Sequence, residues 1–332
     1  MTGKPDPDRA DGPGTAAFPS TVKRWGWLRK LIYLLLTGLV LFFVGRYLIA
    51  SARGIAWDEL RLAPLPLTVG VFCLLAQHLV AGVAYSMVLA AFGKPIGLVR
   101  SSAVYWTATL GKYLPGKVAT VAGGAVMLAR LGIPMPVAAG TPLLMIMLTV
   151  VIGLVVSAPL LLMESVRAVL PAGWAWAVLV ILIGLTCLHP RVFVRLVNVA
   201  MVRLKRETIR VKPSSGRLMA AVLLGFLRYG LLGLAVWAVA RSVTDVPTAQ
   251  YPVFVAVSAC ASVTGLLAFF APAGIGVREG IYLAVLGPLV GPGLAALVAA
   301  GVRIIQTLVE VGAGACGVLL LKSRFTDPGP AG

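Results

Sequence analysis

Long apolar runs, each close to the length that crosses a bilayer, constrain the fold of this chain more than any other feature. The hydrocarbon core of a membrane is about 30 Å thick, which takes about 20 residues of α-helix. Hydrophobic residues make up 59% of the 332 residues and charged residues 12%, so a water-soluble fold could not bury the apolar surface. We predict an all-α polytopic membrane protein with six full transmembrane helices, at residues 31–49, 65–92, 135–163, 172–188, 218–240 and 294–321.

Two further apolar regions, 98–130 and 252–290, are each interrupted near the middle by Pro and Gly. The first interruption is KYLPGK at 112–117, and the second is PAGIGVREG at 272–280. Proline removes a backbone donor, and a broken helix in lipid is costly unless protein covers the freed groups or they line a cavity. Two interpretations are open: short loops between ordinary helices, or hairpins that re-enter the membrane and whose broken ends form a polar site.

Each interrupted region lies between two long predicted helices, so residues 65–163 and 218–321 have the same order of elements. If both regions turn back, the two sets of elements cross the membrane in opposite directions. That is the pattern of an inverted repeat whose discontinuous segments meet near the membrane midplane. We therefore predict one transmembrane domain over 26–322, with repeat-like halves joined by the loop 189–217.

The net charge of +18 is concentrated between the apolar runs. The tail 1–25, rich in Pro and Gly, is predicted to be disordered, and the loop 189–217 carries eight basic residues against one acid. The positive-inside rule places this tail, this loop and the short C-terminal tail 323–332 on the cytoplasmic side of the membrane. We expect this membrane to be a bacterial-type inner membrane. No basic run is interleaved with aromatics in a foldable soluble segment, so nucleic acid is not an expected partner. The stretch 192–202 is predicted either as a plain loop or as a helix lying in the membrane interface.

Charged residues within or beside apolar segments are the candidate substrate-binding residues. A charge at the centre of a transmembrane helix costs about 2.5–3.5 kcal/mol on insertion scales, so such residues usually pair or line a pathway. Cations outnumber acids in this group, and a phosphate headgroup could bind those left unpaired. Internal ion pairing, of Arg278 or Arg303 with Glu279 or Glu310, is the alternative. With the Pro and Gly of the interruptions, the predicted substrate-binding residues are Lys112, Pro115, Gly116, Lys117, Arg130, Arg228, Pro272, Gly274, Gly276, Arg278, Glu279, Arg303, Gln306 and Glu310.

No catalytic or metal-binding constellation emerges from the sequence. Residues 111–117 match the GxxxxGK start of a nucleotide-binding loop, but Val118 stands where Ser or Thr is required and no strand precedes it. The histidines His78 and His189 are far apart in sequence and have no acid close by, and the four cysteines show no paired or metal-ligand spacing. We therefore predict neither an enzyme nor a cofactor.

The segment GKYLPGKVATVAGGAVMLAR at 111–130, the segment PAGIGVRE at 272–279 and the helix carrying Arg303 resemble the lysylphosphatidylglycerol synthase transmembrane-region family. Its relatives are often called flippase-like, and the resemblance covers nearly the whole chain after residue 25. Ala273 stands where the family more often has Gly. In two-domain members the membrane region is thought to move the modified lipid between leaflets, while a soluble domain, which this sequence lacks, transfers the amino acid. The resemblance therefore implies lipid translocation without aminoacyl transfer.

These observations together predict a protein that flips an anionic phospholipid or a polyprenyl-phosphate-linked lipid between leaflets for cell-envelope synthesis. Envelope glycosyltransferases are candidate protein partners. The alternative from a different class is a membrane-embedded lipid-linked glycosyltransferase, or an accessory subunit to one.

Overall fold

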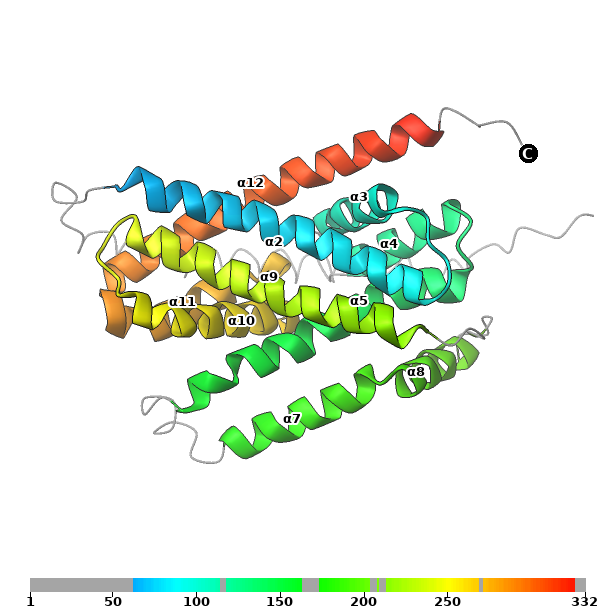
Figure 1. The fold of residues 1–332 in the computed structure, drawn as a ribbon, viewed down its shortest axis with the longest axis horizontal. Helices are drawn as coiled ribbons and strands as arrows, with labels where there is room; N and C mark the ends of the chain where they lie inside the picture. Colours follow the sequence, from blue (N-terminus) through cyan, green and yellow to red (C-terminus); the bar gives the residue numbers. More distant parts are fainter. Residues whose placement is uncertain are drawn as a thin grey trace, which may run out of the picture.

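Helices form all the regular secondary structure in the described part of the chain (Figure 1). The computed structural model describes residues 62–113, 118–162, 173–203, 208, 213–268 and 271–325. The predicted all-α polytopic membrane fold is confirmed. The predicted helix 31–49 and the predicted tail 1–25 lie outside the described residues. Within them, five helical segments are long and apolar enough to cross a membrane: Pro64–Ala91, Met135–Leu161, Ser215–Arg241, Thr248–Leu267 and Pro292–Lys322.

Proline marks the start of the helices α2 (Pro64–Ala91), α5 (Met135–Ser157) and α10 (Tyr251–Leu267), each of which has a proline in its first two positions. Pro292 likewise opens α12 (Pro292–Phe325). The fixed φ of proline suits the first helical turn, where its missing N–H would have had no intrahelical partner. These boundaries therefore follow from the local sequence.

The first interrupted region forms a hairpin of short helices. After α2 come α3 (Leu98–Thr109), the 3₁₀ turn η3 (Leu110–Tyr113) and α4 (Val118–Arg130), followed by α5 and η4 (Ala158–Leu162). Helices α3 and α4 pack against each other. Their 12 and 13 residues correspond to about 18–20 Å, which is shorter than the hydrocarbon core of a membrane. The chain therefore turns back between them.

The second interrupted region forms a corresponding hairpin. After α9 (Ser215–Arg241) and η5 (Thr248–Gln250) come α10, the 3₁₀ turn η6 (Pro272–Gly274) and α11 (Val277–Val290), followed by α12. Helix α11 packs against α10. The first arm of this hairpin, the segment Thr248–Leu267, is by itself long enough to span a membrane. The sequence did not indicate this span, because residues 252–290 form one interrupted apolar run.

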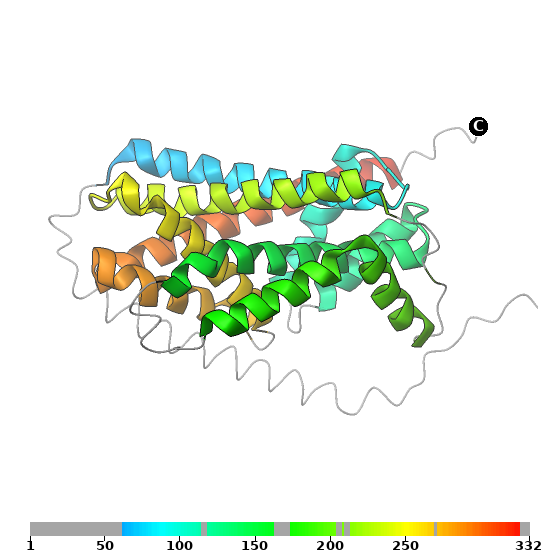
Figure 2. The same ribbon diagram turned by 60° about the horizontal axis from the view of Figure 1, so that its bottom comes forward.

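The elements from α2 to α5 and those from α9 to α12 run in opposite directions. In this comparison α2 corresponds to α9, and α5 corresponds to α12. In Figure 1, α2 and α12 run from left to right along the chain, whereas α5 and α9 run from right to left. The hairpin of α3 and α4 lies in the right half of the bundle and that of α10 and α11 in the left half, in both views (Figures 1 and 2). Their tips meet inside the bundle, where η3 contacts η6. This is the geometry expected of an inverted repeat with discontinuous segments.

Two helices connect these sets. Helix α7 (Gly173–Leu188) has 16 residues, or about 24 Å, and the residues 163–172 that precede it are not described. Helix α8 (Pro190–Arg203) follows it directly, so the stretch 192–202 is a helix and not a plain loop. Arg191 and Arg195 are exposed on α8, as are the apolar side chains of Leu196, Val199 and Val202. This composition suits a helix lying at a membrane surface.

The long helices α2 and α9 form the most extensive pair in the bundle. A Cβ at Gly70 of α2 would lie 2.9 Å from Val239 Cγ2 of α9, so only glycine allows this approach. On the other side of α9, a Cβ at Gly233 would lie 2.4 Å from the Cα of Val255 in α10. Small residues let helix backbones approach closely in membranes, where the hydrophobic effect does not drive helices together.

Candidate functional site

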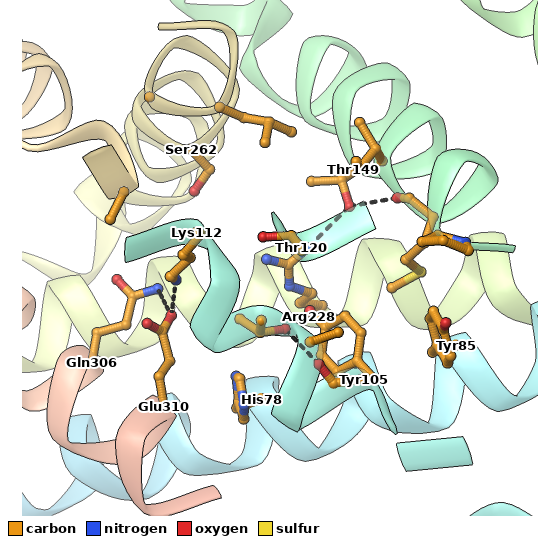
Figure 3. Close-up of a pocket in the computed structure, with 18 of the residues that line it drawn as sticks. His78, Tyr85, Tyr105, Lys112, Thr120, Thr149, Arg228, Ser262, Gln306 and Glu310 are labelled. Atoms are coloured by element: carbon orange, nitrogen blue, oxygen red, sulfur yellow. Dashed lines mark hydrogen bonds and ion pairs between the residues drawn. The ribbon is translucent and has the colours of Figure 1, made fainter. Parts of the chain in front are cut away.

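A cavity of about 140 Å³ lies inside the bundle, close to where the two hairpin tips meet (Figure 3). Its lining comes from α2, α5, α9 and α12 as well as from both hairpins. A buried water needs about 10–15 Å³ on this measure, so the cavity has room for about ten waters or for a small headgroup. The predicted residues that it brings together are Lys112, Arg228, Arg278, Gln306 and Glu310.

Glu310 of α12 ties the tip of the first hairpin to the second half of the chain. Its Oε1 lies 2.5 Å from the Nζ of Lys112, and its Oε2 accepts a hydrogen bond of 2.5 Å from the hydroxyl of Tyr113. The side-chain amide of Gln306, one turn earlier on α12, donates to Oε1 at 3.2 Å. Glu310 is buried, so this carboxylate is fully engaged by three partners.

Glu279 stabilises the turn of the second hairpin. Its Oε2 accepts a hydrogen bond of 2.7 Å from the backbone N–H of Gly276, at the start of α11. Its Oε1 lies 3.7 Å from the Nε of Arg303, whose Nη2 donates to the carbonyl of Ala273 at 3.1 Å. Arg303 and Glu279 therefore fix the turn between α10 and α11 to α12. This pair is one of those that the ion-pairing alternative anticipated.

Ala273 lies at a backbone conformation that favours glycine. Its φ is 51°, in the left-handed region, and Gly274 follows with a φ of 72°. A side chain with a Cβ is strained in this region by about 1–2 kcal/mol, a penalty that glycine escapes. This explains physically why glycine would suit position 273 as well as or better than alanine.

The side chain of Arg278 packs against Gly265 and lines the cavity. A Cβ on Gly265 of α10 would lie 2.5 Å from both the Cγ and the Nε of Arg278, so the Arg278 side chain occupies the space that any larger residue would fill. The Nε of Arg278 is buried without a hydrogen-bond partner. Packing against Gly265 therefore positions Arg278, with no described carboxylate in an ion pair with it.

Arg228 of α9 has only uncharged partners among the described residues. Its Nε donates to the Gln77 side-chain oxygen at 3.3 Å, and its Nη1 donates to the Thr149 hydroxyl at 3.4 Å. Its guanidinium also lies 5.6 Å from the ring centroid of Tyr229. Hydrogen bonds of this length orient the guanidinium but do not neutralise it.

Within the described residues, three cations and one carboxylate line the cavity: Lys112, Arg228, Arg278 and Glu310. Because Glu310 pairs with Lys112, the positive charges of Arg228 and Arg278 are left over. An excess of two half-buried positive charges inside a membrane bundle is unfavourable unless an anion binds there. Arginine forks match a phosphate group in both charge and geometry.

The other predicted substrate-binding residues either do not line the cavity or lie outside the described residues. Gly274 and Gly276 shape the turn of the second hairpin, with positive φ, and Pro272 begins η6. Arg130 is exposed in the last turn of α4, at the end of the bundle, and does not line the cavity. Pro115, Gly116 and Lys117 lie outside the described residues.

The sequence did not single out the uncharged polar lining, which includes Gln77, His78, Tyr85, Tyr105, Thr109, Thr120, Thr149 and Ser262. One signal was available for two of these residues. Gln77 and His78 are adjacent polar residues within the apolar run 65–92, and buried polar residues in a membrane helix usually face a functional interior. The tyrosines and threonines carry no such signal, since they also occur on lipid-facing and packing surfaces.

The chain matches a known protein family. The family described as the lysylphosphatidylglycerol synthase transmembrane region matches residues 28–314, so the chain belongs to that family and the resemblance predicted from sequence is confirmed. The match includes both hairpins and the segment of α12 that carries Arg303 and Glu310. No curated protein matches the chain.

Proposed function

We propose that this member of the lysylphosphatidylglycerol synthase transmembrane-region family moves an anionic lipid between the leaflets of a bacterial-type inner membrane. The lipid is a phospholipid or a polyprenyl-phosphate-linked lipid. The observation that carries the proposal is the cavity at the hairpin tips, in which Arg228 and Arg278 lack a carboxylate partner among the described residues.

The arrangement of the hairpins supports movement between leaflets. The two hairpins approach the cavity from opposite ends of the bundle (Figures 1 and 2). Displacing one hairpin at a time would open the cavity toward one leaflet and then the other, as in transporters with inverted repeats. Because the lipid phosphate would meet Arg228 and Arg278 midway, the charged headgroup would not cross an apolar barrier unassisted.

Charge distribution supports a topology with both termini in the cytoplasm. Helix α8 and the C-terminal end of α12 lie at the same end of the bundle (Figure 1). Basic residues gather at that end, among them Arg130, Arg191, Arg217 and Lys322. By the positive-inside rule this end faces the cytoplasm.

The test is lipid movement in vesicles reconstituted with the purified full-length protein. Phosphatidylglycerol labelled on an acyl chain should move from one leaflet to the other faster than labelled phosphatidylcholine, and Arg278→Ala should abolish the difference. Arg130→Ala is the matched control, since Arg130 is exposed and away from the cavity. Equal rates for the two lipids, or no movement above protein-free vesicles, would contradict the proposal.

A further inference from the structure

An aromatic wall forms one side of the cavity. The ring of Tyr105, on α3, lies 5.9 Å from the ring of His78 and 5.5 Å from the ring of Tyr85, both on α2 (centroid distances). All three residues line the cavity, as does Arg228 (Figure 3). The wall and an arginine without a carboxylate partner are therefore neighbours in one site.

Polar atoms of this wall have no hydrogen-bond partner among the described residues. The Nε2 of His78 and the hydroxyl of Tyr85 are buried without a hydrogen bond, and so is the Thr120 hydroxyl on α4. The His78 side chain is 3% exposed and that of Tyr85 is 2% exposed. Buried polar groups are nearly always hydrogen-bonded, so several unpaired ones around a single cavity point to a ligand that supplies the partners.

The carboxylates close to the cavity are already engaged. Glu310 is bound by Lys112, Tyr113 and Gln306, and Glu279 is bound by Arg303 and the N–H of Gly276. Apart from the cations Lys112, Arg228 and Arg278, the remaining polar lining in the described ranges consists of hydroxyl, amide and imidazole groups. A positively charged headgroup would find no free acid there and would be repelled by Arg228 and Arg278.

We propose that the headgroup bound in this cavity is a phosphate that carries an uncharged, hydroxyl-bearing group, and that lipids with an added positive charge are excluded. The phosphate binds Arg228 and Arg278. The attached group, a glycerol or a sugar, packs its C–H faces on the aromatic wall and exchanges hydrogen bonds with Tyr85 and His78. This inference rests on the proposed function and names the substrate class of the same site.

Four acyl-labelled or prenyl-linked lipids distinguish the headgroups in reconstituted vesicles. They are phosphatidylglycerol, a polyprenyl-phosphate hexose, lysylphosphatidylglycerol and phosphatidic acid. We expect the glycerol or the sugar lipid to move at least tenfold faster than lysylphosphatidylglycerol and faster than phosphatidic acid. Whichever of the first two moves faster identifies the source of the hydroxyl-bearing group.

Tyr85→Phe tests the wall itself. Because the Tyr85 hydroxyl has no hydrogen-bond partner within the described ranges, its removal should leave thermal stability equal to or above that of the parent. Movement of the preferred lipid should fall about fivefold or more, as expected for one lost hydrogen bond. Movement of phosphatidic acid should not change. Tyr251→Phe is the matched control, since Tyr251 donates to the Gly230 carbonyl and does not line the cavity.

The outcomes separate this inference from the proposed function. A protein that moves none of the four lipids overturns the proposed function and this inference with it. A protein that moves lysylphosphatidylglycerol as fast as phosphatidylglycerol and the hexose lipid overturns only the headgroup inference. Tyr85→Phe overturns it as well if transport is unaffected, or if the protein is destabilised and all lipids slow equally.

Discussion

The two hairpin tips meet at one cavity, but they are stabilised in different ways. Among the described residues, the tip of the first hairpin, at Lys112 and Tyr113, is held by one carboxylate, Glu310, which comes from the other half of the chain. The second tip carries its own support, because Glu279 caps Gly276 within the same hairpin and Arg303 joins both to α12.

This difference distinguishes charges that stabilise the fold from charges that are available to bind a ligand. Lys112 is a cation of the cavity, but Glu310 neutralises it, so its first role is to tie the hairpin to α12. Arg278 is placed by packing over Gly265 and has a buried Nε without a partner. Residues of the same charge, a few ångströms from the same cavity, should therefore respond oppositely to substitution.

The largest effect is expected at Glu310. Glu310→Ala leaves the half-buried Lys112 without its counter-ion and removes the partner of Tyr113 and Gln306. Removing one member of a buried pair typically destabilises by about 3–5 kcal/mol. The measurement is thermal or denaturant unfolding in detergent, with lipid movement measured in parallel.

A double substitution sharpens that result. Lys112→Met with Glu310→Leu removes both charges, and replacing a buried pair with apolar residues is often neutral for stability. We expect the double variant to recover most of the stability lost by Glu310→Ala. If the single substitution leaves the unfolding midpoint unchanged, Glu310 does not anchor the first hairpin.

A smaller loss is expected from Gly265→Ala. The added Cβ would lie 2.5 Å from the Cγ of Arg278, so the arginine or the α10 backbone must shift. Overpacking of this kind costs about 1–3 kcal/mol, and the displaced guanidinium should also lower transport. Gly312→Ala on α12, where the new Cβ meets nothing within 4 Å, should leave both stability and transport intact. Normal transport by Gly265→Ala would show that the position of Arg278 is not critical.

The smallest effect on stability is expected at Arg278 itself, together with the largest effect on transport. Arg278→Ala removes a membrane-embedded charge that no described carboxylate pairs with, so the free energy of unfolding should fall by less than about 0.5 kcal/mol or should rise. Arg278→Lys should keep part of the activity, because an ammonium preserves the charge but not the fork that matches a phosphate. A strongly destabilised Arg278→Ala would reveal a structural partner and contradict the comparison.

The sequence predicted the features of this site that depend on local composition. Pro and Gly within apolar runs indicated the two interruptions, and charges in the same runs indicated Lys112, Arg278 and Glu310. It did not predict which charges pair, because Lys112 and Glu310 are 198 residues apart and meet only through the packing of hairpin and helix. The ion-pairing alternative left Arg303 with either Glu279 or Glu310, and in the structure it pairs with Glu279.

The aromatic wall was beyond the reach of sequence reasoning for a physical reason. Tyr85 and Tyr105 occur in apolar surroundings, where a tyrosine also serves at lipid interfaces or in packing. Only the three-dimensional arrangement shows that their rings lie next to each other at a tilt and line one cavity. Arg130 illustrates the reverse error, because it belongs to the first recognised segment and yet lies exposed at the end of α4.

Native mass spectrometry of the protein purified with its bound lipid tests the central claim most directly. The wild-type protein should retain a phosphate-bearing lipid of net negative charge. The double variant Arg228→Ala with Arg278→Ala, shown to be folded by its unfolding midpoint, should lose that lipid. Retention of the same lipid by the folded double variant, or retention of only zwitterionic lipid by the wild-type protein, would contradict phosphate recognition by these two arginines.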